Sequence, residues 1–225
     1  MATDTAIATV TLALRQTIQS AINAAAELSA DVVSENPDKL SNTGDAVINV
    51  YMLQGQINPY LRNNDLEPQL SAHTEDGKRK VTRRWVTPLV LNYLISFYGD
   101  ERALVPQRLM AVTVAALHRN PVVTPERLAR IARAAFPDAP ALPVSDFEDV
   151  EIEMSPQSVQ DVHRIWTALR APYALSTLYE ARTALIQSDP DSQDLPVVEA
   201  LDIRAVNKRR PPDVDIDGPE GQSSK

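Results

Sequence analysis

Histidines are the first candidates for acid–base chemistry or metal binding, because an imidazole titrates near neutral pH. This 225-residue chain has three, His73, His118 and His163, which are far apart and fall in different predicted elements. None has a second histidine four residues away, the spacing that places two metal ligands on one helix face. We interpret all three as surface or locally satisfied side chains, and we predict no metal and no cofactor.

Carboxylates are the second candidates, because a pair of them can carry out general acid–base catalysis. The run DFEDVEIEM (146–154) places Glu151 and Glu153 in alternation with Val150 and Ile152, which predicts a strand with one buried and one solvated face. We therefore expect these carboxylates to face solvent. A small enzyme that uses Glu151 and Glu153, or Asp65 with Arg62, stays open as an alternative.

Other catalytic patterns are missing from the sequence. The chain has no cysteine, which excludes disulfides, thiolate zinc sites and thiol catalysis, and fits a reducing compartment. Its six glycines are scattered and form neither a phosphate-binding loop nor a Gly-x-Ser-x-Gly motif. We therefore do not expect an enzyme.

A basic stretch, KRKVTRR (78–84), begins with Lys78, Arg79 and Lys80 and is a candidate for binding a polyanion. The formal net charge of the chain is −8, which disfavours long-range attraction to nucleic acid. We interpret the stretch as a solubilising tip or a salt-bridging contact and expect no nucleic acid partner. A nucleic-acid-binding module that uses this loop is the second alternative.

Targeting and membrane-spanning patterns are also missing. Asp4 stands where a secretory signal carries positive charge, and Arg15 interrupts the apolar stretch that follows it. The longest uncharged apolar stretch, 85–99, is shorter than the roughly 18–20 residues that cross a bilayer. We expect a cytoplasmic protein without stable membrane insertion.

The elements that position these residues follow from apolar spacing. Apolar residues three or four apart within 7–28 predict an amphipathic helix that faces the core. Both alternating sets of 46–53 are largely apolar, which predicts a strand covered on both faces. Residues 73–84 are polar and predict a long exposed loop or a hairpin tip, and residues 86–99 predict a second buried strand.

Helices and strands alternate in the second half of the chain, which indicates an α/β or α+β fold with a mixed sheet flanked by helices. The last extended candidate, LPVVEALDIRAV (195–206), follows a polar link, and the composition beyond Lys208 predicts a mobile tail. Helices are predicted at 102–118, from Pro125 and from Ser155-Pro156, and strands at 150–154 and 176–187.

Four ordered blocks resemble one family. The blocks are NVYMLQGQINPYLRNNDL (49–66), PLVLNYLISFYGD (88–100), RLMAVTVAALHRNPVVT (108–124) and 155–186. Together they resemble the amino-terminal domain of the cap, or tail-terminator, proteins of contractile injection systems, which are phage-tail-like particles of the antifeeding-prophage kind. Two features are the most specific. One is the Leu-Arg-Asn-x-Asp corner at 61–65, and the other is a longer pattern that consists of Trp166, Leu169, Pro172, Tyr173, Ser176 and Tyr179.

The resemblance implies a structural role without catalysis. In that family six copies form a ring on the end of the inner tube and sheath that is distal to the baseplate, so the implied partners are a homo-hexamer, the inner tube protein and the sheath protein. The ring ends polymerisation and couples the last sheath layer to the tube. Asn64 departs from the apolar residue that relatives often carry, and residues 191–225 lie outside the resemblance.

These observations divide the chain into a cap domain (1–190), an extended arm open to strand exchange (191–207) and a mobile tail (208–225). The corner after Pro59 reads as a joint between subunits, not an active site, and the arm reads as a strand that adds to a neighbouring sheet. The alternative is that the arm closes the sheet edge of its own domain. Interface candidates are Arg62, Asn63 and Asp65 at the corner, Lys78, Arg79 and Lys80 in the basic stretch, and Val197, Val198, Leu201 and Ile203 in the arm.

Overall fold

The computed structural model describes residues 5–25, 27–40, 45–59, 69–75, 78–139, 144, 147–188 and 193–195, with the backbone alone for 69–75, 78–86, 184–188 and 193–195. Its elements in chain order are α1 (Ala6–Ala24), β1 (Asp31–Val33), the 3-10 turn η1 (Pro37–Leu40), β2 (Val47–Ile57), β3 (Gln69–Glu75), β4 (Lys78–Tyr98), α2 (Val105–Arg119), β5 (Val122–Val123), α3 (Pro125–Ala135), β6 (Val150–Met154), α4 (Val159–Leu169), β7 (Leu175–Ser188) and β8 (Gln193–Leu195).

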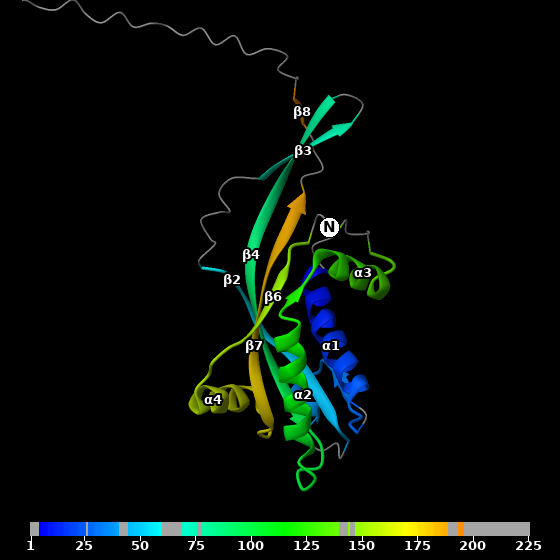
Figure 1. The fold of residues 1–225 in the computed structure, drawn as a ribbon. Coiled ribbons are helices and arrows are strands. Elements are labelled where there is room, and N and C mark those ends of the chain that lie inside the picture. Colours follow the sequence, from blue (N-terminus) through cyan, green and yellow to red (C-terminus); the bar gives the residue numbers. More distant parts are fainter. Residues whose placement is uncertain are drawn as a thin grey trace, which may run out of the picture.

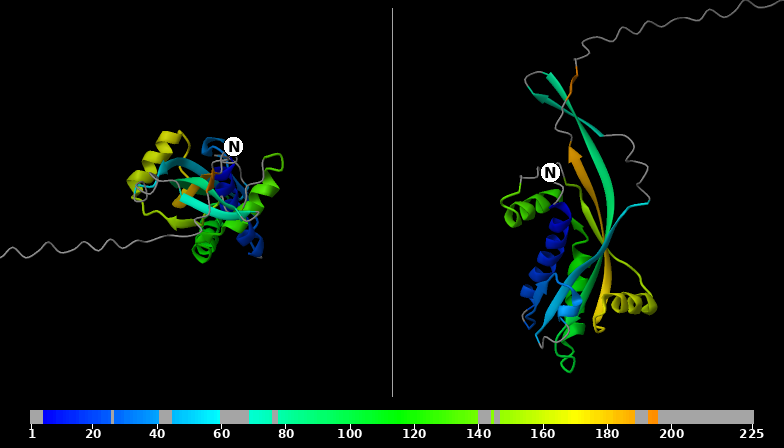
Figure 2. Two further views of the ribbon diagram at one scale, coloured as in Figure 1. Left: turned by 90° about the horizontal axis from the view of Figure 1, so that it is seen from above. Right: turned by 180° about the vertical axis from the view of Figure 1, so that it is seen from behind.

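All described strands belong to one twisted sheet with helices on both faces (Figures 1 and 2). The strand order is β1-β2-β4-β7-β6-β5, and β3 and β8 pair with β4 outside this path. β1 and β2 are parallel, whereas the other pairs are antiparallel, so the sheet is mixed. The predicted α+β class is confirmed.

Strand β4 is the longest element, with 21 residues, and it organises the sheet. Along one side it pairs first with β3 and then with β2, and along the other first with β8 and then with β7. Its second half was predicted as a buried strand, and it ends at Tyr98 before Gly99 as expected. Its first half, within the polar stretch 73–84, forms a hairpin with β3, so the hairpin interpretation is confirmed and the loop interpretation is wrong.

The main core lies between the sheet and the layer of α1, α2 and α3 (Figure 1). The apolar stripe of α1 faces this core as predicted, and Leu14 and Ile18 are fully buried. Tyr93 is also buried there, and its hydroxyl lies 2.9 Å from the Thr11 hydroxyl. The strand predicted at 46–53 is buried on both faces from Val47 to Val50 and continues, increasingly exposed, to Ile57.

A smaller core lies on the opposite face of the sheet, under α4. Trp166 is its centre and packs with Leu94 of β4 and Leu178 of β7. The indole is 2% exposed, and its Nε1–H donates to Ser176 Oγ at 3.1 Å. The prediction that Trp166 lies on a core-facing stripe is confirmed.

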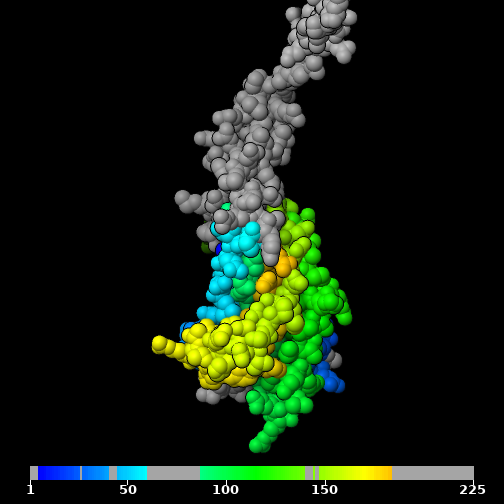
Figure 3. All heavy atoms as spheres, turned by 90° about the vertical axis from the view of Figure 1, so that its left-hand side faces the viewer, coloured from blue at the N-terminus to red at the C-terminus, as the bar shows by residue number. Residues whose placement is uncertain are grey.

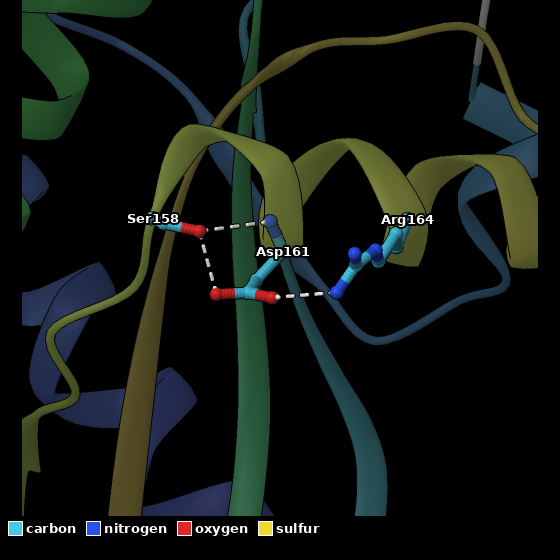
Figure 4. A network of polar contacts seen from close by, with 3 residues as sticks. All are labelled: Ser158, Asp161 and Arg164. Atoms are coloured by element: carbon cyan, nitrogen blue, oxygen red, sulfur yellow. Dashed lines mark hydrogen bonds and ion pairs between the residues drawn. The ribbon is translucent and has the colours of Figure 1, made fainter.

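Helix α4 begins later than predicted. The Ser155-Pro156 pair suggested a start there, but the Ser155 amide donates to the Leu178 carbonyl at 2.9 Å, which keeps this segment beside the sheet. Ser158 is the N-cap instead: its Oγ accepts from the Asp161 amide at 3.2 Å and donates to the Asp161 carboxylate at 2.6 Å (Figure 4). Arg164 completes the network with a 3.4 Å contact to the other Asp161 oxygen.

Candidate assembly surfaces

Three of the ten predicted interface residues lie in the part of the chain that the structure describes. Lys78, Arg79 and Lys80 begin β4 and lie at the hairpin, which projects past the helices (Figure 1). The backbone of Arg79 and Lys80 is paired on both sides, with β3 and with β8. Seven predicted residues lie outside the described part of the chain: Arg62, Asn63, Asp65, Val197, Val198, Leu201 and Ile203.

The carboxylates of β6 lie on the exposed sheet face as predicted, since Glu151 and Glu153 are both exposed. The register places Arg182 of β7 opposite Glu151, and Glu180 opposite Glu153. Arg182 forms a 2.8 Å ion pair with Glu153 and a 3.6 Å contact with Glu180. The Ser155 hydroxyl donates to Glu180 at 2.9 Å.

This network is a surface charge cluster and offers no enclosed site. The side chains of Glu153 and Arg182 are 63% and 41% exposed, so water screens their charges. Sequence reasoning missed Arg182 and Glu180, because only the pairing of β6 with β7 brings them to the carboxylates. His118 and His163 are exposed, and among the described residues no three His, Asp or Glu side chains group as a metal site.

The buried Tyr93 hydroxyl has a perturbed pKa, and its role is structural. Burial raises the pKa of Tyr93 to about 12, and the hydrogen bond with Thr11 offsets only part of this effect. Tyr93 is a buried member of the main core. It therefore keeps its proton throughout the physiological range and holds α1 against β4.

A groove of about 260 Å³ lies where the end of β4 and the start of β7 meet the start of α2. Tyr173 forms part of its wall, is 66% exposed, and packs edge-on against Trp166 with ring centroids 6.0 Å apart. An exposed aromatic ring that is held in place is typical of interface contact residues. Other lining residues are Leu40, Phe97, Tyr98, Pro106 and Leu175.

The loop between β4 and α2 carries a second exposed apolar residue, two positions before Pro106 of the groove wall. Leu104 is 56% exposed and has φ 54°, in the left-handed region that disfavours a branched side chain. Residues held in such conformations often cluster at functional sites. Leu104 and Tyr173 therefore mark this end of the domain as a candidate contact surface.

No described helix is long and apolar enough to span a membrane. The described surface has exposed charges, exposed apolar residues and a projecting hairpin, which are candidate contacts for another protein. The class that the fold and surfaces indicate is an α+β domain whose candidate functional sites are contact surfaces.

Sequence comparison identifies the family. Residues 9–199 match the Pvc16 N-terminal domain, and because this match covers most of the chain, the chain belongs to that family. Among curated proteins, the comparison found no match.

Two structures determined by cryo-EM match this chain, and the first has a similar fold. The anti-feeding prophage cap (AFP tube terminating cap) shares 16% identity with a TM-score of 0.53, over 84% of this chain and 59% of that one. The second structure is the sheath/tube terminator, in the extended state, of PVC, an extracellular contractile injection system. It shares 15% identity with a TM-score of 0.48, over 85% of this chain and 62% of that one. The chain thus spans about three fifths of the length of each structure.

Proposed function

We propose that this chain is a structural cap of a contractile injection system, which ends polymerisation of the inner tube and sheath. The observation that carries the proposal is the family match over residues 9–199 together with a fold similar to a tube-terminating cap. The cap acts by binding and not by catalysis, since its exposed carboxylates lie in a solvated ion-pair network.

The cap functions as a ring of six copies that binds the inner tube and the last sheath layer, and it assembles in the bacterial cytoplasm. A closed ring requires heterologous interfaces, in which one surface of each copy binds a different surface of the next. The surface around Tyr173 and Leu104 supplies apolar contact area for one such partner. The corner residues Arg62, Asn63 and Asp65 form a joint between subunits.

The arm attaches the cap to its neighbours. Gln193–Leu195 pair with β4 of the same chain, which anchors the start of the arm beside the hairpin. The residues beyond, among them Val197, Val198, Leu201 and Ile203, add as a strand to a sheet of the last sheath subunit or of a neighbouring cap subunit. Truncation after Asp194 is expected to leave thermal stability nearly unchanged and to abolish sheath binding. A truncated protein that unfolds, or that still holds sheath, would contradict the arm.

The cap proposal is tested by deleting the gene in its host and imaging the particles by electron microscopy. We expect tubes of irregular length or particles without a stable sheath, and restoration of normal particles by the full chain supplied in trans. Particles of normal length and normal sheath from the deletion strain would refute the proposal. Decoration of purified tube ends by a hexamer of the purified chain is the matching measurement in vitro.

A further inference from the structure

Part of the sheet face that carries α4 is not covered by that helix. Cross-strand pairing places Gln54, Asn92, Glu180 and Glu153 in one row across β2, β4, β7 and β6. Paired residues share a face, and Asn92 and Leu94 are two residues apart on β4. The row therefore lies on the same face as Leu94, and Leu94 is the residue that α4 covers. Figure 3 views this side, with α4 in yellow low on the molecule and the strands β2 and β6 exposed above it.

This open face is acidic. Glu151, Glu153 and Glu180 lie on it, Arg182 is the basic residue paired with them across β6 and β7, and exposed Glu148 and Asp149 precede β6. Arg182 is already paired with Glu153 and contacts Glu180. The surface therefore retains a surplus of negative charge that attracts a basic partner.

The β3–β4 hairpin has the opposite character. Residues 69–84 contain five basic and two acidic residues, although the whole chain has a formal net charge of −8. Backbone pairing with β3 and β8 occupies both edges of β4 at 79–81, so this part of the hairpin cannot recognise a partner by strand addition. Recognition along this part of β4 therefore uses side chains, and charge is the chemistry that this sequence offers.

The hairpin also lies away from the layer of helices. It extends past the helices in both side views (Figures 1 and 2). Two copies of an acidic chain repel unless a basic surface of one meets an acidic surface of the other.

We propose that the β3–β4 hairpin of one copy docks on the open β6–β7 face of the next copy, with Lys78, Arg79, Lys80, Arg83 and Arg84 opposite Glu151, Glu153 and Glu180. The contact is heterologous, so repeating it closes a ring when the rotation between copies allows closure. This inference rests on the proposed cap function, since it identifies a contact between ring subunits.

The absence of cysteine from the sequence makes the test direct. Purified Glu153→Cys protein is mixed with Arg79→Cys protein, and separately with Lys80→Cys protein, because successive strand residues point to opposite faces. Each mixture is oxidised free in solution and with purified inner tubes, then analysed on a non-reducing denaturing gel. His118→Cys, exposed on α2 on the other side of the sheet, replaces Glu153→Cys as the matched control.

We expect at least one hairpin variant to give disulfide-linked dimers with Glu153→Cys, roughly tenfold above the His118→Cys control. Each variant oxidised alone is expected to run mostly as a single uncross-linked chain on the denaturing gel. Equal yields with His118→Cys, or efficient cross-linking of Glu153→Cys with itself, would overturn the proposal. If wild-type protein ends tubes but the cysteine variants show no selective cross-link, the proposed contact is refuted and the cap function stands. If the cysteine variants show the selective cross-link but wild-type protein does not end tubes, the contact stands and the cap function is refuted.

Discussion

Replacing Trp166 with alanine is the sharpest test of how α4 is held on the sheet. The indole is 2% exposed and packs with Leu94 and Leu178 in a core that is separate from the main one. Its N–H donates to Ser176 Oγ, and its ring contacts Tyr173 edge-on. Truncation therefore removes the centre of the smaller core.

The expected loss follows from these contacts. A buried Trp side chain covers about 200 Å², and at about 25 cal/mol per Å² this corresponds to roughly 5 kcal/mol as an upper estimate. The indole hydrogen bond contributes about 1 kcal/mol more. Measured truncations of buried aromatic residues cost about 3–5 kcal/mol, so we expect Trp166→Ala to lower the free energy of unfolding by that amount.

The assay is urea denaturation of the full chain, with thermal unfolding as a second probe. For a domain of this size, 3–5 kcal/mol lowers the melting temperature by roughly 6–20 °C. Val159→Ala on the same helix is the matched control, because Val159 is 86% exposed and surface changes usually stay within about 0.5 kcal/mol. A loss below about 1 kcal/mol for Trp166→Ala would show that the indole is not a core residue.

Three further changes test local features. Ser158→Ala removes the α4 N-cap and is expected to cost about 1 kcal/mol by urea denaturation. The Ser158 hydroxyl also lowers the pKa of Asp161 below its ordinary value of 3.8. The contribution of Asp161 to folding stability is therefore present above pH 3.8 and is lost as the pH falls through the lower pKa of the folded state. An Asp161 pKa that NMR finds unchanged in Ser158→Ala would contradict this. Tyr93 ionises near pH 10 when unfolded and near 12 when folded, so wild-type stability should fall by about 3 kcal/mol between these values, and Tyr93→Phe should flatten that fall. Gly99→Ala should destabilise by about 1–3 kcal/mol, because Gly99 has φ 147° and an added Cβ would lie 2.7 Å from Val105 Cγ1; a melting temperature equal to wild type would refute the strain.

The spacing of apolar residues predicted those helices and strands whose buried and exposed side chains follow a regular period. The stripe of α1 repeats every three or four residues and is buried as expected, and the alternation of Val150 and Ile152 identified β6. The start of α4 was misplaced because Ser155 and Ser158 are both good caps by sequence. The choice between them depends on the Leu178 carbonyl, which is distant in the chain.

The candidate surfaces were predictable only in part. The basic residues Lys78, Arg79 and Lys80 were evident from sequence because their charges are consecutive. Their position on a long strand was not evident, since polar residues conceal a strand whose stability comes from pairing with β3 and β8. The cluster around Arg182 and the groove beside Tyr173 form from segments that only the tertiary fold brings together.

The length of β4 has a mechanical consequence. Strand hydrogen bonds in antiparallel pairs lie perpendicular to the strand axis. A force that pulls the hairpin and the Tyr98 end of β4 apart therefore loads the flanking bonds in shear, all at once, and does not open them one by one. From Arg84 to Phe97 β7 runs alongside β4 without interruption, and β2 shares the load on the other side from Leu89 to Tyr98. A subunit built in this way can transmit tension from one end to the other through a single stiff strand, and it should resist stretching along this axis far better than peeling at the sheet edges.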